Sequence, residues 1–364
     1  MHIVVDLSAH GFGHAGMTAP IVARLPARFP GVRITVRSAL PARVLRERLA
    51  ADFELAPPPP DPGMAMHSPF SVDAAASATW YEQLYESWDE SVCAQAAQLD
   101  ALGADLLFAN IPFLSLEAAR LAGIPALAYC SLNWADVYRA HAEPSAQAAA
   151  IHARMQAAYR CADVFLQPQP SMPMDDLTNR LPIGPVARVS SRAGGPVARM
   201  SSRAPRKLPG AERRVLLSFG GISGAHVLEL PRIEHVRWLV PDEYSASRAD
   251  ITRHSDSGLA FIDLLASCDA AVTKPGYGMF VEAACNGVRV AYLPRDEWPE
   301  ARYLCAWLHE HATALELDED RVQEGRLASD IAELLERPAR AAVTPTGIEQ
   351  ALDAIDRAVR RGAL

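Results

Sequence analysis

Two histidines flank a glycine-rich turn directly after the first strand-like run of the chain. The segment reads Ser-Ala-His-Gly-Phe-Gly-His-Ala-Gly, with His10 and His14 on either side of Gly13. The apolar pattern around it predicts a strand that turns into a helix, so His14 would stand at a helix N-terminus. There the helix dipole keeps an imidazole neutral, and a neutral imidazole can accept a proton near pH 7. His14 is therefore a candidate general base, although both histidines could instead simply hydrogen-bond the loop.

The same turn also matches a dinucleotide-binding pattern. Gly11, Gly13 and Gly16 form a GxGxxG motif after a predicted strand. In dinucleotide-binding folds an acidic residue about 20 positions later bonds the ribose. Here the second predicted strand ends at Arg37, which suits the 2′-phosphate of NADP instead. An NADP-dependent enzyme is thus a minority interpretation.

A second turn with binding potential lies in the C-terminal half. Lys274-Pro-Gly-Tyr-Gly follows a strand-like run and opens a helix that carries Glu282. The N–H groups and positive dipole end of such a helix suit a diphosphate, and Glu282 one turn further could accept the ribose hydroxyls of a nucleotide. Lys274 suits a phosphate contact or a surface salt bridge equally well. With an earlier Gly-Gly turn, the candidate nucleotide-binding residues are Gly220, Gly221, Lys274, Gly276, Tyr277, Gly278 and Glu282.

Short apolar runs alternate with helical patterns in both halves of the chain. Ile3–Val5 is such a run in the first half and Ala270–Thr273 in the second. Runs that are buried on both faces and joined by helices are typical of parallel α/β sheets, whose ligands bind at the carboxyl ends of the strands. The predicted organisation is an N-terminal domain over 1–170, a linker over 171–212, a C-terminal domain over 213–346, and a helix over 347–364 that could cross back to the first domain.

A duplicated decapeptide stands in the predicted linker. Gly184–Ala193 reads Gly-Pro-Val-Ala-Arg-Val-Ser-Ser-Arg-Ala, and Gly195–Ala204 repeats it with Met in place of the second Val. One duplication is too short for a solenoid, and its composition favours a flexible tether without ligand contacts. The alternative is that its four arginines contact phosphates.

Two further features lie before residue 105. The proline-rich stretch from Pro57 to Phe70 predicts a loop on the rim of the sheet. The helix predicted from Val72 to Leu102 carries an aromatic stripe, which favours packing over a ligand pocket.

Composition narrows the possible functions. The 364 residues include 35 Lys and Arg against 43 Asp and Glu, a net charge of −8, so no basic field favours nucleic acid. The six cysteines form no metal-binding spacing and are expected to be reduced thiols. No apolar stretch approaches the roughly 20 residues of a membrane span, and the start lacks a signal-peptide pattern. A cytoplasmic protein is expected.

Taken in order, these motifs resemble a known family. A His-Gly-Phe-Gly-His turn, a linker, Ser-Phe-Gly-Gly, Lys-Pro-Gly-Tyr-Gly with Glu282, and Leu-Pro-Arg-Asp-Glu-Trp-Pro-Glu ending at Glu300 are similar to the GT-B fold of nucleotide-sugar glycosyltransferases. In particular the chain resembles the glycosyltransferase-like half of plant L-arabinokinases and, more distantly, the peptidoglycan N-acetylglucosaminyltransferase.

The resemblance implies two Rossmann-like domains facing across a cleft, a UDP- or TDP-linked sugar donor, a small-molecule acceptor, and no resident cofactor or metal. His14 would be the acceptor-side base of an inverting transfer. Gly276, Tyr277 and Gly278 would meet the diphosphate and Glu282 the ribose. The residues that would contact acceptor or sugar are His10, Gly13, Asn133, Trp134, Arg295 and Glu300.

Other functions fit the same architecture. A sugar-nucleotide epimerase or hydrolase and a non-catalytic nucleotide-sugar sensor are the alternatives. The family pattern also leads us to expect an arginine soon after His14, where this chain has Gly16 and Met17. The sequence names neither the acceptor, the donor sugar nor the oligomeric state.

Overall fold

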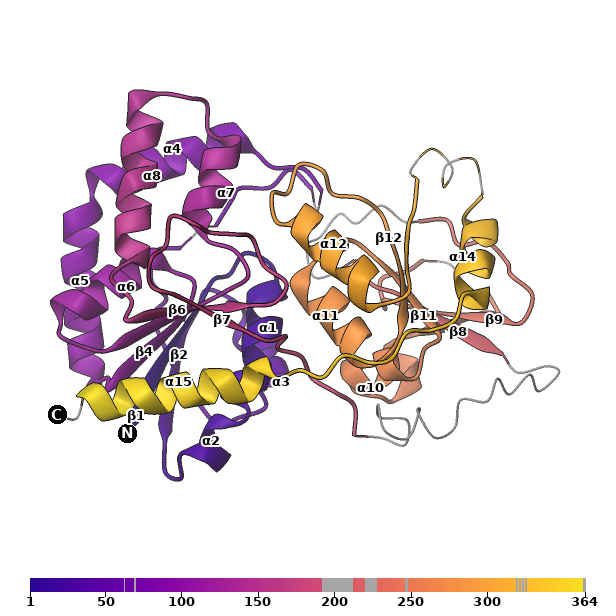
Figure 1. Ribbon diagram of the computed structural model, residues 1–364, viewed down its shortest axis with the longest axis horizontal. Coiled ribbons are helices and arrows are strands. Elements are labelled where there is room, and N and C mark those ends of the chain that lie inside the picture. Colours follow the sequence, from indigo (N-terminus) through magenta and orange to yellow (C-terminus); the bar gives the residue numbers. More distant parts are fainter. Residues whose placement is uncertain are drawn as a thin grey trace. The chain divides into compact units, whose positions relative to one another are not determined.

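A computed structural model describes residues 1–61, 63–68, 70–191, 212–219, 228–245, 248–318, 320, 322, 324 and 326–362. The chain divides into two compact units (Figure 1). The N-terminal unit comprises Met1–Val186, Glu297–Glu300 and Thr346–Leu364, and the C-terminal unit comprises Ala187–Asp296 and Ala301–Pro345. In the described part of the chain, no helix has the length and apolar character that crossing a membrane requires.

A seven-stranded parallel sheet forms the centre of the N-terminal unit, in the order β3-β2-β1-β4-β5-β6-β7. Its central strands are apolar and buried on both faces, which is why they appear in the sequence as continuous apolar runs. The strands are β1 (His2–Leu7), β2 (Arg33–Arg37), β3 (Glu54–Ala56), β4 (Leu106–Asn110), β5 (Ala126–Tyr129), β6 (Val164–Pro168) and β7 (Arg180–Ile183).

Helices cover this sheet. They are α1 (Gly13–Val22), α2 (Leu25–Arg28), α3 (Ala42–Leu49), α4 (Ala74–Glu86), α5 (Trp88–Leu102), α6 (Phe113–Leu121), α7 (Trp134–His141) and α8 (Ala146–Tyr159). The single helix predicted from Val72 to Leu102 is divided at Ser87, which leaves helical geometry and whose N–H still bonds Gln83. The predicted packing role of its aromatic stripe is confirmed for Tyr81 and Trp88, which are buried.

The C-terminal unit has its own parallel sheet, in the order β10-β9-β8-β11-β12-β13. Both parallel sheets predicted from the sequence are thus present. The strands are β8 (Arg213–Leu217), β9 (Val236–Val240), β10 (Ile251–Arg253), β11 (Ala270–Thr273), β12 (Arg289–Tyr292) and β13 (Ala314–Glu316). The helical elements are η1 (Ser255–Ser257), α10 (Phe261–Ala266), α11 (Tyr277–Cys285), α12 (Ala301–His311) and α14 (Leu327–Glu336).

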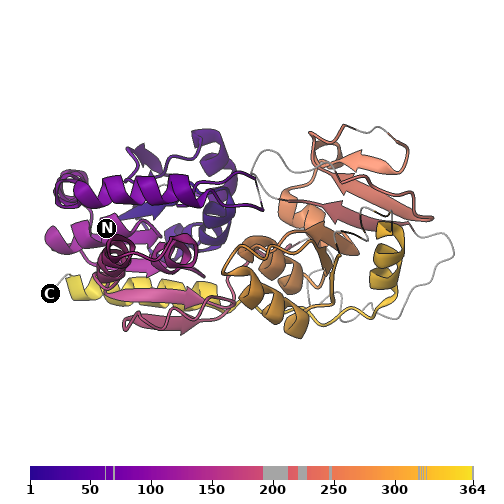
Figure 2. The ribbon, with the colours of Figure 1, turned by 90° about the horizontal axis from the view of Figure 1, so that it is seen from above.

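The last helix, α15 (Gly347–Gly362), belongs to the N-terminal unit although it follows the whole C-terminal unit in sequence. It runs beside β7 in both views (Figures 1 and 2) and also contacts α1 and β5. Its face toward the sheet is apolar, with Leu352 and Ile355 buried. Arg24 and Arg28 pair with its acidic outer side.

The range predicted as a linker, 171–212, contains ordered structure. Residues Arg180–Ile183 form β7, an edge strand that the sequence hides because Pro182 interrupts its apolar run. Residues 184–191 of the first decapeptide copy are also described and partly buried. The rest of the duplicated region, 192–211, lies outside the described residues.

Candidate functional site

His14 lies in the first turn of α1, directly after the carboxyl end of β1. Its Nδ1 faces the Asn110 Oδ1 at 2.8 Å. The Asn110 Nδ2 donates to the His14 carbonyl at 3.4 Å and to the Thr18 hydroxyl at 2.8 Å. Because a carbonyl can only accept, the amide oxygen must be the atom that meets the ring. His14 Nδ1 therefore carries the proton, and the lone pair of the neutral ring is on Nε2.

The surroundings of His14 keep it neutral. Its side chain is buried, and burial lowers the pKa of His14 from 6.5 to about 4, against a smaller opposing contribution from the Asn110 hydrogen bond. The imidazole is therefore unprotonated throughout the neutral range. This arrangement is that of a general base whose tautomer and orientation are set by a neighbouring side chain.

An aromatic wall stands beside His14. His10 stacks on Trp298 with ring centroids 5.4 Å apart and an interplanar angle of 3°, and meets Trp134 edge-on at 5.1 Å. Trp134 in turn lies 5.3 Å from the His14 ring. Gly63 has φ +65°, and a Cβ there would come within 2.8 Å of His10, so this glycine lets the proline-rich loop pack on the wall.

Asp61, in that loop, was missed by the sequence analysis. Both of its carboxylate oxygens are buried without a well-formed hydrogen bond, near the Ser8 hydroxyl and the Trp134 indole. Burial raises the pKa of Asp61 to about 7; nearby Asp6 adds to the rise, while Ser8 and Trp134 oppose it. The available signal was that Asp61 is the only acidic residue between Pro57 and Phe70.

Glu300 joins the His14 surroundings in the N-terminal unit. The Ser131 hydroxyl donates to its Oε1 at 2.5 Å and the Trp298 indole N–H to its Oε2 at 3.2 Å. Cys130, whose Sγ lies 3.8 Å from the His14 Nδ1, has its pKa raised by burial and by the negative charge of Glu300. The structure thus brings His10, His14, Trp134 and Glu300 together.

Asn133 and Gly13 lie at the starts of α7 and α1 and shape the backbone there. The Asn133 Oδ1 accepts from the Asp136 N–H at 2.8 Å and its Nδ2 donates to the Asp136 carboxylate, so this amide caps α7. A Cβ at Gly13 would meet nothing within 4 Å, which leaves room beside the start of α1. Asn133 therefore positions Trp134, the first residue of α7.

In the C-terminal unit, α11 begins at Tyr277 after the extended Gly276. Gly276 offers no capping side chain, and the first turn of this helix holds no acidic residue. A Cβ at Gly278 would meet nothing within 4 Å, so an anion can approach the backbone there. Tyr277 is buried and Lys274 is half-buried. The predicted Gly220 and Gly221 lie outside the described residues.

Glu282 is buried in the second turn of α11 and is engaged by an arginine that the sequence analysis assigned to the tether. The Arg188 Nε donates to Glu282 Oε1 at 2.7 Å and its Nη2 to Oε2 at 3.3 Å. Arg295, predicted with Glu300 as a sugar contact, is buried in the C-terminal unit, whereas Glu300 belongs to the N-terminal unit.

Arg37 does not fit the NADP interpretation. Its side chain is fully buried, with Nε 2.7 Å and Nη2 2.5 Å from the two oxygens of Asp6. Its Nη1 also bonds Gln95. A guanidinium held in this way does not face a ligand phosphate, so Arg37 is not the partner of a 2′-phosphate that the NADP interpretation expected.

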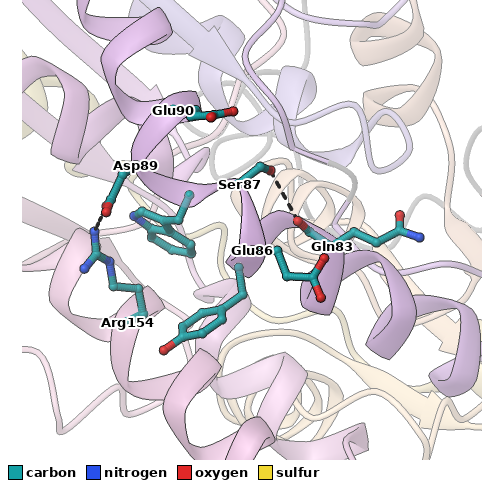
Figure 3. A pocket seen from close by; sticks show the side chains of 8 residues that line it. Gln83, Glu86, Ser87, Asp89, Glu90 and Arg154 are labelled. Carbon is teal, nitrogen blue, oxygen red and sulfur yellow. Dashed lines mark hydrogen bonds and ion pairs between the residues drawn. The ribbon is translucent and has the colours of Figure 1, made fainter.

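The N-terminal unit has two further features. A cavity of about 420 Å³ opens at the junction of α4 and α5 and is lined by charged residues, with Arg154 directed toward Asp89 (Figure 3). Among the described residues, one group has metal-ligand spacing: Asp136, His152 and Asp176. Arg139 already pairs with both of these carboxylates.

Comparison with solved structures shows which fold this is. The calicheamicin glycosyltransferase CalG4 is 14% identical over 99% of this chain and 94% of its own, with a TM-score of 0.60. The spinosyn rhamnosyltransferase SpnG is 16% identical over 99% and 96%, with a TM-score of 0.59. The glycotransferase of kitacinnamycin is 17% identical over 99% and 95%, also with a TM-score of 0.59.

These likenesses confirm the predicted GT-B fold of two parallel-sheet α/β domains. SpnG structures include one with thymidine diphosphate and one with spinosyn aglycone. No protein-family model matches the chain, and no curated protein matches it in sequence. The finer resemblance to the L-arabinokinases stays a prediction.

Proposed function

We propose that this protein is a glycosyltransferase that moves a sugar from a UDP- or TDP-linked donor to a small-molecule acceptor, without a metal and with inversion at the anomeric carbon. The observation that carries the proposal is the state of His14 in a chain of GT-B fold. It is a neutral, buried imidazole whose tautomer is fixed by Asn110 and whose Nε2 keeps a lone pair.

In this mechanism His14 Nε2 takes the proton of the acceptor hydroxyl or amine as that atom attacks the anomeric carbon. The bond from the anomeric carbon to the donor phosphate breaks, and the nucleoside diphosphate leaves with the bonding electrons. The start of α11, with Gly276 and Gly278, supports the binding of that diphosphate, because backbone N–H groups and the helix dipole stabilise the developing negative charge. Glu282 accepts the ribose hydroxyls.

The acceptor side is supported by the aromatic wall of His10, Trp134 and Trp298. Trp134 and Trp298 are buried and His10 is partly exposed, so an acceptor ring would meet this wall at His10, with the buried carboxylates of Asp61 and Glu300 nearby. SpnG has been solved with an aglycone, which makes a small organic acceptor the first class to test.

Nucleotide binding and product analysis test the proposal. UDP and TDP should bind in calorimetry, and Glu282→Ala should weaken that binding at least tenfold, since charge-assisted hydrogen bonds contribute roughly 1.5–3 kcal/mol each. Val281→Ala, its neighbour on α11, is the matched control for the helix. Failure of both nucleotides to bind the wild type would overturn the proposal.

Incubation with donor alone separates the remaining functions. A transferase leaves the nucleotide-sugar largely intact until an acceptor is added. Rapid release of free sugar, or conversion to an epimer, would instead identify a hydrolase or epimerase. Tight donor binding that survives with no turnover against a broad acceptor panel, and without effect of His14→Ala, would identify a sensor.

A further inference from the structure

The first decapeptide copy is fixed to the C-terminal unit by a set of backbone and side-chain hydrogen bonds. The Ser190 N–H donates to Asn286 Oδ1 at 3.0 Å, and Asn286 Nδ2 donates to the Arg188 carbonyl at 3.1 Å. The Ser190 hydroxyl donates to Asp263 Oδ1 at 2.6 Å. Asn286 follows α11 and Asp263 lies in α10, so this segment bridges two helices. The backbone around Arg188 is therefore held in place by contacts that do not involve its own side chain.

The Arg188 side chain reaches from this fixed backbone to Glu282. The Glu282 side chain is only 7% exposed and that of Arg188 is 28% exposed, so the carboxylate is buried while the guanidinium is partly solvated. A buried carboxylate without a partner is costly and tends to take up a proton. The two-point contact through Nε and Nη2 offsets that cost and fixes the plane of the carboxylate. Each carboxylate oxygen has two lone pairs, so two acceptor positions remain after Arg188 has taken one on each.

We propose that Arg188 is a positioning residue of the nucleotide site, which fixes the Glu282 carboxylate so that its remaining lone pairs accept the two ribose hydroxyls. This inference rests on the proposed function. It gives a ligand-related role to a segment whose composition favours a tether. A diol with two donors needs two acceptor positions, and the two-point contact with Arg188 leaves one on each carboxylate oxygen.

Charged and titratable groups from three elements surround Glu282. The Arg188 guanidinium pairs with its carboxylate, and Cys285 on the same helix has its pKa raised to about 12 by burial and by the charge of Glu282. Asp263 lies beyond Ser190 on the α10 side. Removing Arg188 therefore takes away a cation that pairs with this buried carboxylate and fixes its plane.

The variants must take account of the second decapeptide copy, which carries an equivalent arginine. Arg199 holds the same place in Gly195–Ala204 as Arg188 holds in Gly184–Ala193. The main variant is therefore the double change Arg188→Ala with Arg199→Ala, which removes the arginine from both copies. Arg199→Ala alone is the matched control, with the same substitution in the same local sequence. Arg188→Lys with Arg199→Ala tests a cation without the two-point contact.

Calorimetric titration with UDP, together with thermal melting, is the measurement. Arg199→Ala should bind UDP with the same affinity as the wild type. The double alanine variant should bind at least tenfold more weakly, because the plane of the Glu282 carboxylate is no longer fixed. The lysine variant should fall between them. In a Glu282→Gln background, removal of both arginines should cause no further loss.

The outcomes separate a positioning role from a structural one. If the double alanine variant binds UDP like the wild type, Arg188 has no role in the site, although the proposed function stands. A tighter complex would show that Arg188 occludes Glu282 and would overturn the inference. A loss of the same size in the Glu282→Gln background, with a lower melting temperature that lysine does not restore, would reduce Arg188 to a structural contact. If the wild type binds neither UDP nor TDP, the proposed function fails and this inference with it.

Discussion

The two units hold their candidate sites in different ways. In the N-terminal unit, the groups around His14 come from segments far apart in sequence: the loop at Asp61, the end of β4 at Asn110, the residues after β5 at Ser131, and the return segment at Trp298. In the C-terminal unit, the main features lie within a single turn and helix, from Gly276 to Glu282. The fold assembles the N-terminal site from distant segments, whereas the residues of the C-terminal site are mostly contiguous in sequence.

This difference indicates that the N-terminal site suits proton transfer and the C-terminal site suits nucleotide binding. The N-terminal site contains side chains whose proton affinity is shifted by burial, which is what acid–base work requires. The C-terminal site offers backbone groups, a helix dipole and one paired carboxylate, which suit a bound anion and a diol. Changes in the first site should therefore alter turnover, and changes in the second should alter nucleotide affinity.

The sharpest test of this division is His14→Ala. A positioned general base contributes about 10²–10⁴-fold, so the turnover number should fall by about that factor while UDP or TDP affinity stays constant. In the wild type the rate should stay level down to about pH 5 and fall as pH approaches 4, since protonation of His14 removes the base. Steady-state kinetics over pH 4–8 and calorimetry measure both effects. A variant that keeps more than about a tenth of the rate would move the role to another residue.

Substitution of Asn110 is a second test of the division between turnover and nucleotide affinity, because Asn110 contacts His14 and should act on turnover through it. Asn110→Ala should lower the turnover number by about 10–100-fold, since the tautomer and ring orientation are no longer fixed. Asn110→Asp places a negative charge beside Nδ1 and should raise the pKa of His14, which moves the acid limb of the rate profile to higher pH. Thr18→Ala, at the other end of the same amide, is the milder control. An unmoved acid limb in Asn110→Asp would contradict the assignment.

Substitution of Asp61 should have a smaller effect, which falls on the stability of the fold. Its pKa is about 7 in the folded state, whereas a solvent-exposed aspartate has a pKa of 3.8, so the folded protein binds this proton more tightly than the unfolded chain does. Its burial therefore costs little stability below pH 4, and the cost grows as pH rises from 4 to 7, by roughly 1.4 kcal/mol per pKa unit, then levels off. Asp61→Asn should thus raise the melting temperature at pH 8 more than at pH 5. An equal shift at both pH values would show that the carboxyl is not buried as a charge.

The smallest effect is expected from shortening the duplicated segment. Deleting Gly195–Ala204 leaves the docked copy in place, and deleting the first copy brings Arg199 and Ser201 to the positions of Arg188 and Ser190. Loop-closure entropy varies slowly with length, so either deletion should leave nucleotide affinity and melting temperature nearly unchanged. Loss of affinity beyond tenfold after removal of the second copy alone would show that both copies are needed.

The same contrast explains which parts of the molecule could be predicted from the sequence. Central strands such as β1 and β11 are continuous apolar runs, and the turn before α11 is a local motif, so both were found. Edge strand β7 and residues Asn110 and Asp61 were not found, because their roles come from neighbours brought together by the sheet order. Asn110 faces His14 only because β4 pairs with β1, where Leu7 lies opposite Asn110. Arg188 was hidden by a composition that favours a tether.

The path of the chain through α15 has a practical consequence. The N-terminal unit closes only after the C-terminal unit has been synthesised, because Leu352 and Ile355 of the last helix cover its sheet. A fragment that stops at Val186 would leave this apolar surface bare, which promotes aggregation. Separating the halves by a single cleavage therefore cannot yield two intact domains. During synthesis, the core of the N-terminal unit is therefore incomplete until α15 has been made.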